Sequence, residues 1–305
     1  MIGKRLCVGD TIGIICPSSA ENIEAIQNGI NFFKKQGFNL KEGKHIYNRL
    51  GYLAGADMER AQDLNNMFVD PNIKMILCIR GGYGSMRTLP HIDFNTIKNN
   101  PKIFVGFSDI TTYLNSFYEK CNLITFHGPM LTSKFEDEFT LNSLLNTVMN
   151  GYNSFTIKNP DHIPTDSNSD ITIEGTLVGG NLSLICSTLS TDFEIDTTDK
   201  ILFIEDVGEE PYSIDRMFTH LLLANKLQAC KGIILGQFTK CSLPHYERSL
   251  TLEEIIQDRI LSLNIPTVLN FMSGHDYPKL TLPIGANIQL DCKNGVIRVL
   301  EPVVG

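Results

Sequence analysis

The sequence predicts an α/β protein with two domains, an open parallel-sheet domain followed by a mixed α/β domain. In the first half, short apolar runs alternate with segments of helical period, which is typical of βαβ units on a parallel sheet. Residues 159–170 are rich in Pro, Asp, Ser and Asn, as linkers are. Near the end, two alternating runs flank Asn294 and Gly295, a hairpin signal. We therefore expect domains at residues 1–158 and 171–305, joined by a linker at 159–170.

Each helix and strand that we expect in the first domain is predicted by a short sequence pattern. The apolar run at residues 11–16 predicts a strand, and apolar residues at helical spacing over residues 23–33 predict a helix that stops at Gly37. A second helix is expected at residues 56–69, where one face is apolar and a proline follows. The remaining elements are expected to be strands at residues 75–79, 103–107 and 124–126 and a helix at residues 110–120.

The second domain mixes the two patterns. We expect strands at residues 172–178, 201–204, 232–236, 286–291 and 296–300, and helices at residues 181–189, 213–224 and 252–263.

Composition excludes several classes of protein. No stretch approaches the eighteen apolar residues that span a bilayer, and Asp10 interrupts the N-terminal apolar run before it can serve as a signal peptide. The net charge of −8 argues against a nucleic-acid partner. The eight cysteines form no C-x-x-C pair, and no histidine or cysteine cluster has the spacing of metal ligands. We therefore expect a cytoplasmic protein without a membrane segment, metal or cofactor.

Ser108 is the most informative residue, because it follows the apolar strand run at residues 103–107 at the point where a helix begins. At such a turn the hydroxyl stands clear of the sheet, and the first amides of the helix can stabilise an oxyanion. The elbow pattern G-x-S-x-G is incomplete, since Ile110 occupies its last position. The alternative is that Ser108 merely caps the helix.

Glu205 and His275 also follow apolar runs, so three reactive side chains come after three strand-like segments. A serine needs a base to take its proton, and a carboxylate that orients the base, and these residue types meet that need. Alternatively, Glu205 belongs to a solvated acidic stretch and His275 to an ordinary turn. His127 is a competing base, because it follows the strand nearest to Ser108, whereas His220 is expected to pack within a helix.

The glycine-rich segment RGGYG at residues 80–84 has three interpretations. It lacks the full G-x-G-x-x-G fingerprint and the Walker lysine, which disfavours a phosphate cradle. It is also suited to supply one backbone amide of an oxyanion hole, with the amide of Asp109 as the second donor. A plain tight turn is the third interpretation.

Four ordered motifs together resemble the LD-carboxypeptidase family of serine peptidases, which includes murein tetrapeptide carboxypeptidases and microcin C immunity peptidases. The motifs are RGGYG at 80–84, GFSD at 106–109, IEDVGE at 204–209 and GHDYPKLTLPIG at 274–285. The resemblance implies that Ser108 is the nucleophile, His275 the general base and Glu205 its orienting carboxylate. It also implies a metal-independent acyl-enzyme mechanism, an oxyanion hole from the amides of Gly82 and Asp109, and a homodimer.

The resemblance leaves the substrate open. The first expectation is release of the C-terminal D-alanine from cytoplasmic murein tetrapeptide, at an L,D amide bond, in peptidoglycan recycling. The second is cleavage of peptidyl-nucleotide antibiotics, which the absence of tryptophan disfavours. A third reading is a non-catalytic protein that binds a small peptide or nucleotide. The candidate substrate contacts are Tyr83 and, as clamps for a free carboxylate, Arg80, Arg87 and Arg216.

Overall fold

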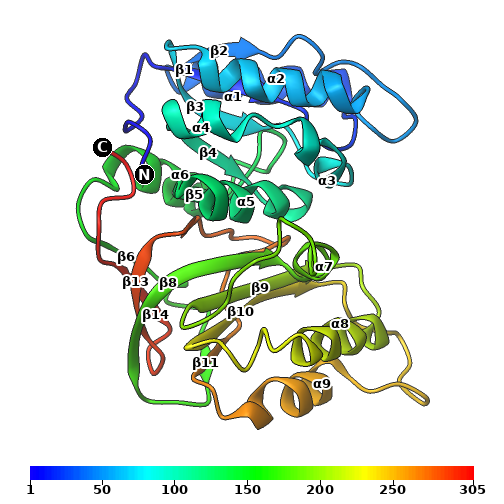
Figure 1. Ribbon diagram of the computed structural model, residues 1–305. Helices are drawn as coiled ribbons and strands as arrows, with labels where there is room; N and C mark the ends of the chain where they lie inside the picture. Colours follow the sequence, from blue (N-terminus) through cyan, green and yellow to red (C-terminus); the bar gives the residue numbers. More distant parts are fainter. The chain divides into compact units, whose positions relative to one another are not determined.

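The computed structural model describes residues 1–305 and confirms the predicted α/β class. Its contacts divide the chain into two compact units (Figure 1). The first unit comprises Met1–Asn153, Thr281–Gly285 and Pro302–Gly305, and the second comprises Ser154–Leu280 and Ala286–Glu301. The chain therefore leaves the first unit and returns to it twice.

The first unit is built on a six-stranded sheet in the order β12-β5-β4-β3-β1-β2. Five strands run parallel, as the alternating pattern predicts, and only β12 is antiparallel, paired with β5 at one edge. The strands are β1 (Thr11–Ile15), β2 (Asn39–Glu42), β3 (Ile73–Cys78), β4 (Ile103–Gly106), β5 (Thr125–His127) and β12 (Leu282–Ile284).

Helices flank this sheet and bury aromatic rings against it. Their bounds are α1 (Ile23–Lys35), α2 (Asp57–Val69), α3 (Ser85–Thr88), α4 (Phe94–Asn99), α5 (Thr111–Cys121) and α6 (Glu138–Asn150). Phe68 of α2 and Phe117 of α5 pack with Phe104 of β4, and the ring centroids of Phe104 and Phe117 are 4.9 Å apart. This contact fixes β4 against α5, and thereby the turn that joins them.

The second unit is built on an eight-stranded sheet in the order β6-β14-β13-β8-β9-β10-β11-β7. Its centre, from β8 to β11, is parallel, and the outer pairs are antiparallel, including the predicted hairpin of β13 and β14. The strands are β6 (Phe155–Ile157), β7 (Asp166–Ser167), β8 (Thr172–Asn181), β9 (Ile201–Val207), β10 (Gly232–Thr239), β11 (Thr267–Leu269), β13 (Asn287–Asp291) and β14 (Val296–Val299). The helices are α7 (Leu182–Ser187), α8 (Pro211–Leu223) and α9 (Leu252–Arg259).

Residues 159–170, expected to form a linker, lie inside the second unit. They contain β7, which pairs with β11, and Asn159 donates a hydrogen bond to the carbonyl of Asn270 at 2.8 Å. The polar side chains that suggested a linker instead satisfy backbone groups of the sheet edge.

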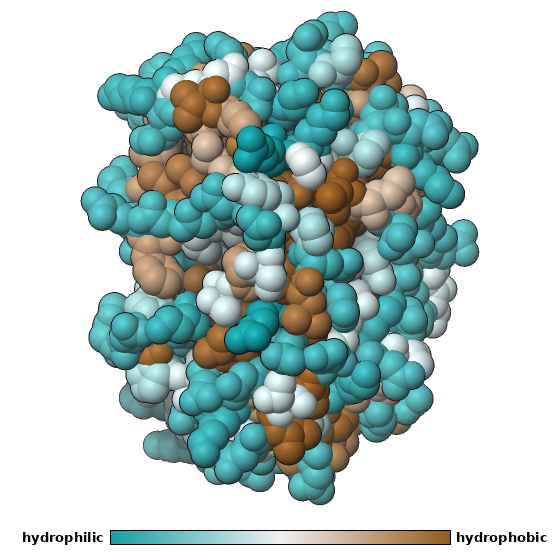
Figure 2. Space-filling view, turned by 90° about the vertical axis from the view of Figure 1, so that its left-hand side faces the viewer, coloured by the Kyte–Doolittle hydropathy of each residue, from teal (hydrophilic) through white to brown (hydrophobic).

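The surface carries exposed hydrophobic residues that are scattered along the chain. On the face drawn in Figure 2 they form separate patches among hydrophilic residues. None of the helices combines the length and apolar character needed to cross a membrane.

Candidate active site

Ser108 occupies a sharp turn directly after β4. Its φ angle is +63°, in the left-handed region that a non-glycine residue rarely adopts. It begins a 3₁₀ turn, Ser108–Ile110, that leads into α5, and it is the N-cap of neither segment. Gly106 makes the turn possible, because a Cβ at that position would lie 2.6 Å from the Ile110 side chain. The helix-cap alternative is therefore wrong, and the strained geometry is that of a nucleophile elbow.

The glycine-rich loop lies against this serine. A Cβ on Gly81 would be 3.0 Å from Ser108 Oγ and 3.3 Å from the amide nitrogen of Asp109. Gly82 has a φ of +110°, and neither its N–H nor that of Asp109 donates a hydrogen bond within the protein. Free backbone donors beside a serine hydroxyl are the components of an oxyanion hole.

The carboxylate of Asp109 ties the three loops together. It is buried, and it accepts hydrogen bonds from the hydroxyl of Ser18 at 2.5 Å and the amide of Ser85 at 2.8 Å. The Ser85 hydroxyl in turn donates to the backbone carbonyl of Asp109 at 2.6 Å. Sequence reasoning gave Asp109 only a backbone role, because no local pattern identifies such long-range donors.

A buried arginine donates hydrogen bonds to backbone carbonyls of the same loops. Arg60, on α2, donates to the carbonyls of Pro17 and Gly84 and pairs with Asp57. The Asp57 carboxylate also accepts hydrogen bonds from Arg87, whose Nε and Nη2 each lie 3.0 Å from a carboxylate oxygen. Together the two arginines hold the pKa of Asp57 below its usual value against the opposing effect of burial.

Glu205 and His275 meet in the second unit. His275 Nδ1 lies 2.6 Å from Glu205 Oε2, although 70 positions separate the residues. Glu205 is fully buried and lies inside β9 rather than beyond its end, so the interpretation as a solvated acidic loop is wrong. A carboxylate on Nδ1 sets the tautomer of the ring and leaves Nε2 as the proton acceptor, which is the arrangement of a general base.

The turn that carries His275 is shaped to approach this carboxylate. A Cβ on Gly274 would lie 3.1 Å from Glu205 Oε2 and 2.9 Å from the Gln237 side chain. Gln237, on β10, accepts the amide of Asp276 at 2.9 Å and donates to the carbonyl of Pro278 at 3.2 Å. The turn is therefore held on both sides of the histidine.

Asp206, the next residue of β9, contacts other residues than Glu205 does. Its carboxylate accepts hydrogen bonds from Asn181 and from the amide and hydroxyl of Ser183, at distances of 2.9 to 3.0 Å. Burial raises the pKa of Asp206. Because successive side chains of a strand point to opposite faces, Asp206 fastens α7 to the sheet while Glu205 faces His275.

The proposed carboxylate clamps differ in their engagement. Arg87 is held by Asp57, and Arg216 lies on α8 with its guanidinium 5.6 Å from the Tyr212 ring centroid. Arg80 makes only a 3.3 Å contact with Glu21 and a 3.3 Å bond to the carbonyl of Gly81.

The remaining candidates are a tyrosine and two histidines. Tyr83 is exposed, and its ring packs edge-on against that of Tyr52 at 5.8 Å. His127 is fully buried on β5, where its ring packs against Phe107. His220, expected to pack, is exposed on α8, because it lies on the outer face of the helix.

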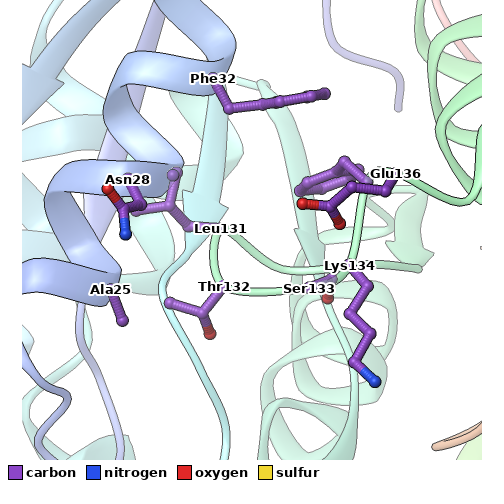
Figure 3. Close-up of a pocket in the computed structure, with 10 residues that line it drawn as sticks. Ala25, Asn28, Phe32, Leu131, Thr132, Ser133, Lys134 and Glu136 are labelled. Atoms are coloured by element: carbon purple, nitrogen blue, oxygen red, sulfur yellow. The ribbon is translucent and has the colours of Figure 1, made fainter.

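A separate pocket lies in the first unit, away from these residues. It has a volume of about 270 Å³ and lies between Asn28 and Phe32 of α1 and the segment from Leu131 to Glu136 (Figure 3). No group of three or more His, Cys, Asp or Glu side chains is arranged to hold a metal ion. The chemistry-bearing groups are therefore Ser108 with its loops in the first unit and the Glu205–His275 pair in the second.

Two family models match the chain. Residues 12–128 match the N-terminal domain of LD-carboxypeptidases, and residues 174–290 match the C-terminal domain. Among curated proteins, a probable murein peptide carboxypeptidase of Bacillus subtilis is 40% identical over 94% of this chain and 91% of its own. The microcin C7 self-immunity protein MccF of Escherichia coli is 30% identical over 99% of this chain and 96% of its own.

Solved structures of related proteins are also similar to this chain. MccF in complex with glutamyl sulfamoyl guanosine superposes with a TM-score of 0.92 at 27% identity, covering 100% of this chain and 99% of that chain. A muramoyltetrapeptide carboxypeptidase from Oxalobacter formigenes has a TM-score of 0.84 at 30% identity, covering 95% of this chain and 97% of that chain.

Proposed function

The chain belongs to the LD-carboxypeptidase family and is therefore a serine-type hydrolase, and from this premise we propose that it releases the C-terminal D-alanine of murein tetrapeptide. Membership of an enzyme family removes the non-catalytic binding protein from the alternatives. The curated relative at 40% identity is named for murein peptide, which supports this substrate.

The proposed mechanism uses Ser108, His275 and Glu205. His275 Nε2 takes the proton of Ser108 Oγ as the oxygen attacks the scissile carbonyl, and Glu205 stabilises the imidazolium that forms. The imidazolium then gives its proton to the departing amine of D-alanine, and water hydrolyses the acyl-enzyme by the same steps. The observation that carries this proposal is the 2.6 Å hydrogen bond between His275 and the buried Glu205.

Two further features support the chemistry. The strained φ of Ser108 projects its hydroxyl away from the sheet, as a nucleophile requires. The free amides of Gly82 and Asp109 are the proposed donors to the tetrahedral oxyanion, whose charge they stabilise more than that of the ground-state carbonyl.

A peptidyl-nucleotide substrate is the second candidate. The TM-score of 0.92 to MccF bound to an acyl sulfamoyl nucleoside favours it. Against it stands the absence of tryptophan, which removes the largest stacking surface for a base and leaves Tyr and Phe rings for that purpose.

The test is mass spectrometry of a murein tetrapeptide incubated with the wild-type chain and with Ser108→Ala, with EDTA present throughout. A glutamyl sulfamoyl adenosine is treated in parallel. Loss of one D-alanine with the wild type alone supports the proposed substrate and nucleophile. Cleavage of only the sulfamoyl nucleoside selects the second candidate, and cleavage of the tetrapeptide by both chains contradicts the serine mechanism.

We further propose a cytoplasmic homodimer in which one domain carries the nucleophile and the other the acid and base. Light scattering on the purified chain tests the dimer, because a mass near 34.1 kDa would contradict it. Cell fractionation tests the location.

A further inference from the structure

Lys279 is a buried charged residue that the proposed hydrolysis does not use. It follows His275 by four positions, and its side chain has no solvent exposure. Its ammonium donates a hydrogen bond to the carbonyl of Gly274, the residue directly before His275, and lies 5.2 Å from the Tyr277 ring centroid. A buried ammonium is costly unless nearby groups compensate it, so this position calls for a reason.

The surroundings of Lys279 supply that compensation. Glu205 from β9 and Asp276 from its own turn act on the charge of Lys279, and the ring of Tyr277 lies beside it. Burial lowers the pKa of Lys279 to about 8, while Glu205 and Asp276 act to raise it. Lys279 is therefore predominantly charged at neutral pH, beside a buried carboxylate.

Lys279 is coupled to the histidine through one residue. The carbonyl of Gly274 accepts the hydrogen bond from the Lys279 ammonium. Gly274 also lies close to Glu205, since a Cβ on Gly274 would be 3.1 Å from Glu205 Oε2. The hydrogen bond from Lys279 thus fixes the peptide that presents His275 to Glu205. Its positive charge also attracts the buried carboxylate of Glu205, which acts to raise the pKa of Lys279.

We propose that Lys279 is a positioning residue of the hydrolytic site, which anchors the Gly274–His275 turn against Glu205. The inference rests on the proposed function, because it takes His275 as the general base.

Three substitutions separate the two effects. Lys279→Gln keeps a donor for the Gly274 carbonyl and removes the charge, Lys279→Met removes both, and Lys279→Arg keeps both. Lys102→Met is the matched control, because Lys102 is also a buried lysine that donates to backbone carbonyls, of Asp70 at 2.7 Å and Ile73 at 2.8 Å. Lys102 precedes β4, at the opposite end of that strand from Ser108.

The values of kcat and KM on the tetrapeptide are measured for all four variants. For Lys279→Met we expect kcat to fall by about 10- to 100-fold with KM nearly unchanged, because a displaced base affects the chemical step. Lys279→Gln retains more of kcat than Lys279→Met because it keeps a donor for the Gly274 carbonyl, Lys279→Arg retains most of kcat, and Lys102→Met changes neither kcat nor KM.

A readout without substrate distinguishes failure of this inference from failure of the proposed function. The His275 ring is observed by NMR in chains with labelled histidine, with His275→Gln identifying the signal. A displaced ring signal in the folded Lys279→Met chain that Lys279→Arg restores supports the inference even if no tetrapeptide is cleaved. An unchanged signal in Lys279→Met overturns it, as does a kcat loss in Lys279→Met no larger than in Lys102→Met.

Discussion

Gly81 leaves no room for a side chain beside Ser108, since a Cβ there would lie 2.9 Å from Ser108 Cβ and 3.0 Å from Oγ. We expect Gly81→Ala to lower kcat/KM by about 100-fold or more, because Ser108, the proposed nucleophile, or its loop must shift by a large fraction of an ångström. Steady-state kinetics on the tetrapeptide measures this effect. Gly51→Ala is the contrasting control, because its φ is +61° and its surroundings are open, so stability falls by about 1 kcal/mol and activity is kept. Equal activity of the two variants would contradict the crowding argument.

Asp109→Ala is expected to lower the free energy of unfolding by about 3 kcal/mol, because the buried Ser18 hydroxyl and Ser85 amide lose a charged acceptor. It should also lower kcat, since the loops on both sides of Ser108 are released. Urea denaturation and kinetics are the measurements. Ser18→Ala removes one donor only and should cost about 1 kcal/mol, so a loss as large as that of Asp109→Ala would argue against the anchoring role.

Glu205→Gln should lower kcat by about 10³- to 10⁴-fold with little change in KM, because an amide does not fix the tautomer of His275 or stabilise its protonated form. The matched control is Asp206→Asn on the opposite face of β9, which should lower stability through Asn181 and Ser183 with a much smaller effect on kcat. If the two substitutions reduce kcat equally, Glu205 is not the orienting carboxylate.

Arg80→Ala should raise KM for a free-acid peptide and leave KM for its amide unchanged, because Arg80 begins the glycine-rich loop beside Ser108 and its contact with Glu21 is long, at 3.3 Å. Arg87→Ala should instead act mainly on stability, through loss of the Asp57 pairing. Equal changes of KM for acid and amide would exclude Arg80 as the carboxylate clamp.

The buried Lys279 makes stability depend on pH in the alkaline range. Its pKa of about 8 in the folded chain lies below the ordinary lysine value of 10.5, so between these values the unfolded chain binds more protons. The free energy of unfolding should therefore rise with pH in that window by up to about 3 kcal/mol, relative to Lys279→Met, and show no such difference in slope below pH 8. Urea denaturation of both chains at pH 7, 8, 9 and 10 measures it, and parallel curves would contradict the lowered pKa.

Short sequence patterns predicted the elements whose structure depends on residues that are close in the sequence. The strand before Ser108, the helix after it and the hairpin at Asn294 and Gly295 follow from short apolar runs and turn residues, and the structure has them. The resemblance identified the family and the enzyme class correctly. The assignment of Ser108, His275 and Glu205 to one triad remains a prediction.

Other features depend on contacts between distant residues. The strand β2 is polar and exposed at a sheet edge, and β12 contains Pro283, so neither shows an apolar pattern that predicts a strand. The left-handed φ of Ser108, the carboxylate bonds of Asp109 and the position of Glu205 inside β9 arise from packing against residues far away in sequence. Helix and strand patterns depend only on residues that are neighbours in the sequence, so they contain no information about these three features.

The edge strand β12 has a consequence for biosynthesis. The sheet of the first unit includes Leu282–Ile284, which leaves the ribosome only after Ser154–Leu280 of the second unit, and Pro302–Gly305 of the first unit follows only after the whole second unit has been made. Until then β5 presents an uncovered edge that an incoming strand of another chain can pair with. A gene fragment ending after Asn153 should consequently give an aggregation-prone product, and a nascent chain should complete the six-stranded sheet only near the end of translation.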